Sequence, residues 1–485
     1  MLARASEIER ELSKYSFIAG RTRQSSQVKL ETVIPAIPEG YVFLDFLKFE
    51  DLKLPAGQQT CYGAVLLTHQ SAPEFVRIDN SANIDKAIDL IRDSITTGAA
   101  GELSEALKVL SEKLWEPIAR VLPPDTHSLV IAPDGNLNFV SFAALLDSDR
   151  RFLAEKYDIS YMGSARDLVR ETNSETIRTL RLFANPAFQR DPAHVEDMQL
   201  AIRSTEIDVF GQLQLPPLPG SEMECAEIQK IASDAGWNLQ TFTREQADEQ
   251  TLRQTKKPGI LHLATHGFYL NSFTPTLTDT RGMSLIGLEQ LKPQSKGVDP
   301  MRASCIALAG AQSTLKSWGG RKAPVPETDG ILTAEEVAAL DLAGTWLVTL
   351  SACESGVGEA RSGEGVLGLR RSFMMAGAEN LLMTLWRVSD QTTPEIMTDF
   401  YREALKTGNA PGSLAKVQRE WLVKLRKEKG LLEAVRDAGP FVMATIGKPL
   451  PPLPREPAKQ ESLLDKVGRK IEALIQSNNT DIKNN

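Results

Sequence analysis

TWLVTLSACESG, at residues 345–356, is an apolar run that ends at a single cysteine, Cys353, and a glycine turn. GILHLATHG, at residues 259–267, has the same design and ends at His266. Each run predicts a buried strand, and in an open α/β sheet catalytic groups collect at the carboxyl ends of strands. We therefore expect Cys353 and His266 to face each other, although they are far apart in the sequence.

Each of the two residues also has a simpler interpretation. A free cysteine is often a buried apolar group, and a lone histidine is often a hydrogen-bonded part of the core. A cysteine is a strong nucleophile as a thiolate, which a nearby imidazole helps to form. Together, the two strand ends favour Cys353 as nucleophile and His266 as general base.

The rest of the chain alternates predicted strands and helices, which favours layers of helix and sheet. Further strands are expected in 37–49, 61–70, 74–80, 127–132, 178–188, 304–310 and 379–388, and helices in 84–95, 103–122, 221–236, 333–342, 392–408 and 461–476. Ser221 with Glu224 predicts a capping box at one helix start, Thr333 predicts a cap at another, and Pro394 marks a third. A proline-rich stretch follows residue 447.

Composition narrows the class of protein. The chain has 485 residues, 42% of them hydrophobic, and a net charge of -8, which does not indicate a nucleic-acid or anionic-membrane partner. Its four cysteines are widely spaced, which disfavours a disulfide framework or a zinc site. The N-terminus lacks the apolar core of a signal peptide, and no stretch has the length of a membrane span. We expect a cytoplasmic protein.

Three other site chemistries are disfavoured. His262 and His266 lie in a predicted strand, roughly 13 Å apart, so they do not form a zinc pair, and His262 is expected to be buried. Gly363, Gly365 and Gly368 have dinucleotide-loop spacing but do not directly follow a strand. Those glycines are expected to shape a loop beside the cysteine. There is no GxSxG motif, and Ser351 is expected in a pocket wall.

At these residues the sequence resembles the CHAT family of caspase-like cysteine proteases, which share a clan with caspases, separase and legumain. The similarity runs over residues 38–447. The matching pieces are HSLVIAPDGNLNFVSFAALL, LPGSEMECAEI, ILHLATHGFY, IALAGAQ, DGILTAEEVAALDL, LSACESGVG and GEGVLGLRRSFMMAGAENLLMTLWRVSD.

The resemblance implies a caspase-like three-layer α/β/α sandwich built from two tandem halves. Residues 38–175 would be a half without catalytic residues, and residues 176–447 would be the catalytic half. An N-terminal helix and connector (1–37) and a proline-rich linker with an amphipathic tail (448–485) would flank them.

The resemblance also implies a catalytic dyad of His266 and Cys353, with the amides of Gly267 and Cys353 as the oxyanion hole. Clan members that cut after arginine or lysine commonly have an acid two residues before the cysteine, where this chain has Ser351. Glu354 or Asp390 could replace that acid. A small or apolar P1 residue is the other interpretation, with Trp386 as a pocket wall. The tetratricopeptide repeats common in the family do not precede this domain.

We thus expect a cysteine endopeptidase without metal or organic cofactor. Its substrate would be a specific protein, a death effector or regulator in bacterial defence or regulated cell death, and an activator protein or ligand would switch it on. The alternative is a catalytically silent scaffold or protein-interaction module, in which the C-terminal helix at 461–476 docks a partner by its apolar face.

Overall fold

The structure is a computed structural model. It describes residues 28–53, 60–69, 71–78, 81–172, 177–189, 214–269, 301, 304–319, 329–351, 360–361, 365–366, 368–386, 388, 392–451 and 453. Cys353, Glu354 and Asp390 therefore lie outside the described residues, as do residues 1–27 and the helix expected at 461–476. The features below belong to the unit that ends at Leu450.

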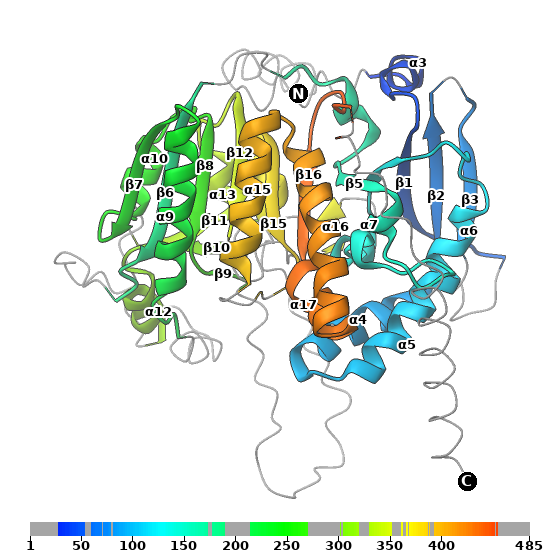
Figure 1. The fold of residues 1–485 in the computed structure, drawn as a ribbon, viewed down its shortest axis with the longest axis horizontal. Coiled ribbons are helices and arrows are strands. Elements are labelled where there is room, and N and C mark those ends of the chain that lie inside the picture. Colours follow the sequence, from blue (N-terminus) through cyan, green and yellow to red (C-terminus); the bar gives the residue numbers. More distant parts are fainter. Residues whose placement is uncertain are drawn as a thin grey trace, which may run out of the picture. The chain divides into compact units, whose positions relative to one another are not determined.

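A large sheet runs through this unit (Figure 1). Within the described residues it has eleven strands, in the order β3-β2-β1-β4-β5-β16-β15-β12-β8-β6-β7. Their bounds are β1 Tyr41–Glu50, β2 Thr60–Thr68, β3 Glu74–Ile78, β4 Ser128–Ala132, β5 Asp158–Tyr161, β6 Thr179–Pro186, β7 Asn238–Arg244, β8 Ile260–Ala264, β12 Thr345–Leu350, β15 Ala378–Thr384 and β16 Phe441–Thr445. Strands β4, β8 and β12 are completely buried, as their unbroken apolar runs predict.

Most neighbouring strands are parallel. Strands β7, β6, β8, β12 and β15 run in one direction, and β1, β4 and β5 are also parallel to one another. The strands expected at 37–49, 61–70 and 74–80 form a meander, because β1, β2 and β3 pair antiparallel in sequence order. Strand β16 pairs antiparallel with β15 and joins β5 through Ala444 and Tyr161, so one sheet contains strands from both sides of residue 175. The division into two halves stays a prediction.

Helices cover both faces of the sheet, which confirms the expected α/β/α layers. In Figure 1, α9, α15 and α16 lie in front of the strands and α13 behind them. The helices are α3 Leu30–Val33, α4 Ser81–Thr97, α5 Ala100–Leu110, α6 Glu116–Ala119, α7 Leu153–Lys156, α9 Pro219–Asp234, α10 Glu249–Gln254, α12 Ala311–Gly319, α13 Ala334–Ala338, α14 Leu369–Ala376, α15 Thr393–Thr407, α16 Ala410–Glu428 and α17 Leu431–Ala438. The helix expected at 103–122 is divided into α5 and α6 by a π-helical turn, Ser111–Trp115. In the described part of the chain, no helix is apolar for long enough to cross a bilayer.

The chain from the predicted strand at 259–267 onward is divided between two sheets. Strand β8 ends at Ala264, and β9 (Gly267–Tyr269) then enters a small sheet with β10 (Ser304–Ala307) and β11 (Ile331–Thr333), in the order β11-β10-β9. The junction is fixed by Ala307, whose carbonyl accepts from Thr265 Oγ1 at 2.5 Å and whose amide donates to the His266 carbonyl at 2.8 Å. The strand predicted to end at His266 ends two residues earlier, at Ala264, because the chain changes sheet there.

Two short strands follow the cysteine in sequence. Strands β13 (Ala360–Arg361) and β14 (Gly365–Val366) pair antiparallel. Both contact the 3₁₀ helix Gly135–Phe139, which follows β4. The chain beyond β12 thus returns against a segment from the N-terminal part of the sheet.

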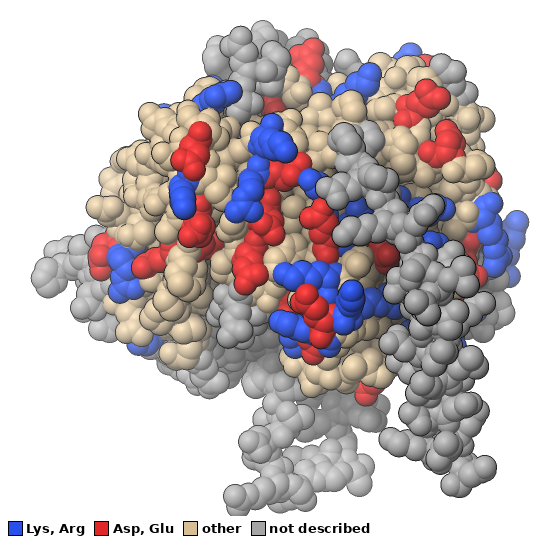
Figure 2. Space-filling view, in the orientation of Figure 1, with Lys and Arg blue, Asp and Glu red and all other residues tan. Residues whose placement is uncertain are grey.

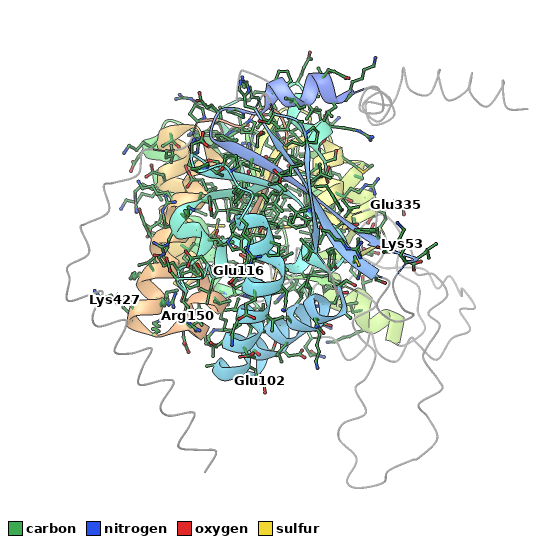
Figure 3. The ribbon with its side chains drawn as sticks, turned by 90° about the vertical axis from the view of Figure 1, so that its right-hand side faces the viewer. Lys53, Glu102, Glu116, Arg150, Glu335 and Lys427 are labelled. Atoms are coloured by element: carbon green, nitrogen blue, oxygen red, sulfur yellow. The ribbon has the colours of Figure 1, made fainter. Side chains whose placement is uncertain are left out.

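Polar contacts join α16 to the N-terminal strands. Arg419 Nη1 forms an ion pair with Asp158 Oδ1 at 2.9 Å, at the start of β5. Arg426 Nη1 donates to the Arg150 carbonyl at 2.6 Å, and Figure 3 shows Arg150 beside Lys427 at the end of α16. On the face seen in Figure 2, basic and acidic side chains are interspersed over α9, α15 and α16.

Candidate active site at the carboxyl ends of β8 and β12

Strands β8 and β12 are parallel neighbours, so their carboxyl ends lie side by side. Leu263 pairs with Leu350, and the Ser351 amide donates to the Leu263 carbonyl at 2.9 Å. His266 is three residues beyond Leu263, and Cys353 is two residues beyond Ser351 in the sequence. The neighbouring strand ends that the sequence predicts are present.

The His266 ring is partly exposed and held on two sides. Its Nε2 lies 2.9 Å from the carbonyl oxygen of Pro216, and its ring centroid lies 5.0 Å from that of Phe188. A carbonyl oxygen only accepts hydrogen bonds, so Nε2 bears the hydrogen and Nδ1 is the basic nitrogen of the neutral ring. This tautomer leaves Nδ1 as the atom suited to exchange a proton.

The segment before α9 that carries Pro216 is itself anchored. The Leu215 amide donates to Gln312 Oε1 at 2.7 Å, and the Leu218 amide donates to Asn185 Oδ1 at 2.8 Å. The Leu215 side chain is buried in a small apolar cluster that contains Phe188. The position of the His266 ring therefore depends on contacts from β6, α9 and α12.

The other predicted site residues have different surroundings. Gly267 begins β9 and pairs with Ile306 of β10. Ser351 is half-buried, and its hydroxyl turns toward α9, where it donates to Glu224 Oε2 at 2.9 Å. Trp386 is buried, and its indole N–H donates to the Arg436 carbonyl at 3.1 Å. The roles of these residues in an oxyanion hole or a substrate pocket stay predictions.

Glu224 is a site residue that the sequence did not reveal. The predicted capping box was wrong, because α9 begins at Pro219, two residues before Ser221. Ser221 Oγ instead donates to the Leu218 carbonyl at 2.7 Å. Glu224 points inward and belongs to the buried stripe of α9 with Cys225 and Ile228. A carboxylate in the apolar stripe of an amphipathic helix was the signal that could have found it.

A buried polar network connects Glu224 to both strands. Its Oε1 lies 3.3 Å from His262 Nε2, while its Oε2 accepts from Ser351. His262 Nδ1 lies 3.0 Å from the Tyr401 hydroxyl of α15, which is 2.9 Å from Thr349 Oγ1. His262 is fully buried, as the sequence predicted, and Glu224 is 3% exposed.

One set of hydrogen positions agrees with the contacts of this network. Burial raises the pKa of Tyr401, so its hydroxyl keeps its proton and can donate to His262 Nδ1. Thr349 then donates to the Tyr401 oxygen, and His262 Nε2–H faces the Glu224 carboxylate. In this arrangement each group donates toward the next one in the network, and the network ends at Glu224. The two carboxylate oxygens of Glu224 face one polar group from each strand, His262 of β8 and Ser351 of β12.

The described thiols are all buried: Cys61, Cys225 and Cys305. Burial raises the pKa of Cys225 well above its ordinary value, and the neighbouring Glu224 carboxylate raises it further. Burial also raises the pKa of Cys305. Within the described ranges, no three His, Cys, Asp or Glu side chains are placed to hold a metal ion.

The chain belongs to the CHAT domain family, whose profile matches residues 104–457. None of the curated protein sequences matches it. Remote similarity extends to the Saccharomyces cerevisiae separase–securin complex, at 11% identity and a TM-score of 0.36. That match covers 79% of this chain and 21% of the other, so this chain spans about a fifth of its length.

Two gingipain structures are similar at the same remote level. The complex of pro- and mature domains of Porphyromonas gingivalis RgpB has 8% identity and a TM-score of 0.35, with 76% of each chain covered. The Arg-specific cysteine proteinase gingipain R has 7% identity and a TM-score of 0.34, with 76% of this chain and 74% of the other covered.

Proposed function

We propose that the protein is a cysteine endopeptidase with Cys353 as nucleophile and His266 as general base. The observation that carries the proposal is the pairing of β8 with β12. The Ser351 amide bonds the Leu263 carbonyl, so a histidine and a cysteine follow two adjacent parallel strand ends. Membership of the CHAT family supports the same reaction class.

The reaction follows from the chemistry of the two side chains. His266 Nδ1 takes the thiol proton, and the Cys353 thiolate attacks the carbonyl carbon of the scissile peptide bond. The imidazolium then gives the proton to the leaving amine, and a thioester remains on the cysteine. Water, deprotonated by the same imidazole, hydrolyses the thioester and restores the thiol. The amides of Gly267 and Cys353 are the proposed donors to the oxyanion.

We propose a specific protein as the substrate, cut in a regulated pathway of defence or cell death, as the family resemblance implies. Two different compositions of the substrate pocket would give different P1 preferences. Glu354 or Asp390 would select a basic P1 side chain, whereas a pocket that includes Trp386 would select a small or apolar one. A peptide library incubated with the protein and with its Cys353→Ala variant separates these outcomes by the residue before each new amino terminus.

The first test is alkylation by iodoacetamide, with each cysteine followed by mass spectrometry between pH 5 and 9. We expect Cys353 to react at least tenfold faster at pH 7 than Cys61, Cys225 and Cys305, which are buried internal controls. His266→Gln should slow Cys353 about tenfold, because a cysteine with an unperturbed pKa near 8.5 is only about 3% thiolate at pH 7.

His69→Gln is the matched control, because the His69 ring also contacts a backbone carbonyl, that of Ile37, but lies next to β2. This variant should leave the alkylation rate unchanged. If Cys353 is as slow as the buried cysteines and His266→Gln has no effect, the proposal is wrong, and the scaffold interpretation replaces it.

A further inference from the structure

The buried network between α9 and the two strand ends suggests a role beyond packing. We infer that Glu224 is a positioning residue that, through His262 and Ser351, fixes the carboxyl ends of β8 and β12 and so orients His266 and Cys353. This inference rests on the proposed function. It assigns no contact with substrate to Glu224.

The carboxylate is divided between the two strands. Its Oε1 faces His262 of β8 at 3.3 Å, and its Oε2 accepts from Ser351 of β12 at 2.9 Å. Among the described residues neither Oε1 nor His262 Nε2 has a hydrogen-bond partner, so the 3.3 Å contact between them is electrostatic. A sliding of one strand against the other would therefore break the Ser351 hydrogen bond or move His262 away from the carboxylate, and each change is unfavourable for buried polar groups.

Helix α15 contacts the same face of this pair of strands. His262 and Thr349 are register partners, so their side chains lie on the same face of the sheet, and both contact the Tyr401 hydroxyl. Helices α9 and α15 lie next to each other on that face (Figure 1). Polar contacts thus hold β12 at two alternate positions, Thr349 and Ser351.

The segment just before α9 also contacts His266 itself. The Pro216 carbonyl is 2.9 Å from His266 Nε2, eight positions before Glu224. One short segment of the chain thus orients the proposed base directly and the proposed nucleophile through Ser351. A purely structural contact would be served as well by apolar side chains, which often replace buried polar pairs without loss of stability.

The test compares four single variants of the full chain and the double variant of Glu224→Met with Ser351→Ala. Glu224→Met removes both acceptor oxygens but keeps an unbranched helix former, and Glu227→Met is its control on the exposed side of α9. Ser351→Ala removes only the hydroxyl, and Ser351→Thr restores it. Two quantities are measured: hydrogen exchange of the Ser351 amide, and the alkylation rate of Cys353 by iodoacetamide.

We expect Glu224→Met and Ser351→Ala each to speed exchange of the Ser351 amide and to slow alkylation of Cys353 by tenfold or more. The double variant should be no slower than the slower single variant, because both changes remove one connection. Ser351→Thr and Glu227→Met should stay within twofold of the unmodified protein. If Glu224→Met does not fold, Ser351→Ala and its rescue by threonine still decide the question.

Two results would overturn the inference. The first is that, in Ser351→Ala, the exchange rate of the residue 351 amide and the alkylation rate of Cys353 stay within twofold of the unmodified protein. The hydroxyl of Ser351 then does not link Glu224 to Cys353. The second is faster exchange of this amide with an unchanged alkylation rate of Cys353. The Ser351–Glu224 hydrogen bond would then stabilise the strand end without positioning Cys353. Slow alkylation of Cys353 in the unmodified protein is a different failure, because it contradicts the proposed peptidase. The Ser351 exchange rates then decide by themselves whether Glu224 fixes the strand end.

Discussion

Tyr401 shows how much of the candidate site depends on one hydroxyl. Its oxygen is within hydrogen-bond distance of His262 Nδ1 and of Thr349 Oγ1, and all three side chains are completely buried or nearly so. Tyr401→Phe would leave both partners without that bond. We expect a loss of about 1–3 kcal/mol in the free energy of unfolding, measured as a lower urea midpoint with an unchanged slope.

Tyr157→Phe is a suitable control for this prediction. Tyr157 is also buried and packs its ring against Trp115, but its hydroxyl bonds none of the described residues. The control should change the midpoint little. Equal effects of the two substitutions would mean that the Tyr401 hydroxyl contributes nothing beyond ordinary burial.

Glu249 predicts a pH dependence of stability. It is 1% exposed, its Oε2 accepts from Arg253 at 3.1 Å, and no donor among the described residues faces its Oε1. Burial and the nearby Asp329 carboxyl raise the pKa of Glu249 to about 8, and Glu336 adds further repulsion. The protonated carboxyl can then donate to Asp329, so the buried pair shares one proton near neutral pH.

The sign of the effect follows from proton binding. Between the ordinary pKa of 4.5 and about 8, the folded protein keeps the Glu249 proton and the unfolded chain has lost it. Stability should therefore fall as the pH rises through this range, by at most about 1.4 kcal/mol per unit. Glu249→Gln should be more stable relative to the unmodified protein at pH 8 than at pH 5, measured by urea unfolding. A difference independent of pH would contradict the shared proton.

The proposed reactive pair was inferred from local sequence, whereas the residues that surround His266 and the end of β12 were not. His266 and Cys353 follow apolar strand runs, and parallel strands bring such ends together. Glu224 and Tyr401 reach His262 from α9 and α15, and no short-range pattern encodes a contact over 139 positions. A short stretch of sequence is thus enough to suggest each proposed reacting group, whereas the residues that position them come from distant parts of the chain.

At the scale of elements, two helix starts with similar sequences behave differently. Thr333 caps α13, as predicted, and also forms a capping box with Glu336. The same spacing at Ser221 and Glu224 does not cap α9, because the helix begins earlier and the buried network uses the glutamate. A capping pattern therefore predicts the presence of a helix more reliably than its first residue.

Helix ends also give a matched stability test. Gly377 ends α14 and Gly408 ends α15, both with positive φ, 114° and 67°. A Cβ at Gly377 would lie 2.7 Å from Ala343 Cα, whereas a Cβ at Gly408 would meet nothing within 4 Å. We expect Gly408→Ala to cost about 1 kcal/mol from backbone strain alone, and Gly377→Ala roughly 3 kcal/mol because overpacking adds to it. Thermal unfolding of both variants measures the difference, and equal losses would mean that the Ala343 backbone yields.

At the scale of the whole unit, the sheet crosses the boundary expected at residue 175. Strand β16 comes last in the chain but lies between β15 and β5, and a single apolar cluster extends from Val42 to Ala444. Arg370 of α14 donates to Asn138 at 2.8 Å, and Arg419 of α16 pairs with Asp158. The meander, the parallel strands and most helices follow from periodicity. The place of β16 does not, because pairing between distant strands has no local sequence signal.

This arrangement predicts that the unit unfolds in one step. Arg419→Met would leave the Asp158 carboxylate, 9% exposed, without its guanidinium partner. We expect a loss of roughly 2 kcal/mol, below the usual cost of breaking a fully buried pair because both groups keep some solvent contact. In calorimetry the whole transition should move to lower temperature, since β5 and α16 share one core. Arg402→Met is the control, because its partner Asp399 is 43% exposed and a surface pair contributes little. A second transition in the Arg419 variant, with the first unmoved, would instead mean that the strands before and after residue 175 fold independently, and β16 would then be a docking strand between two separable halves.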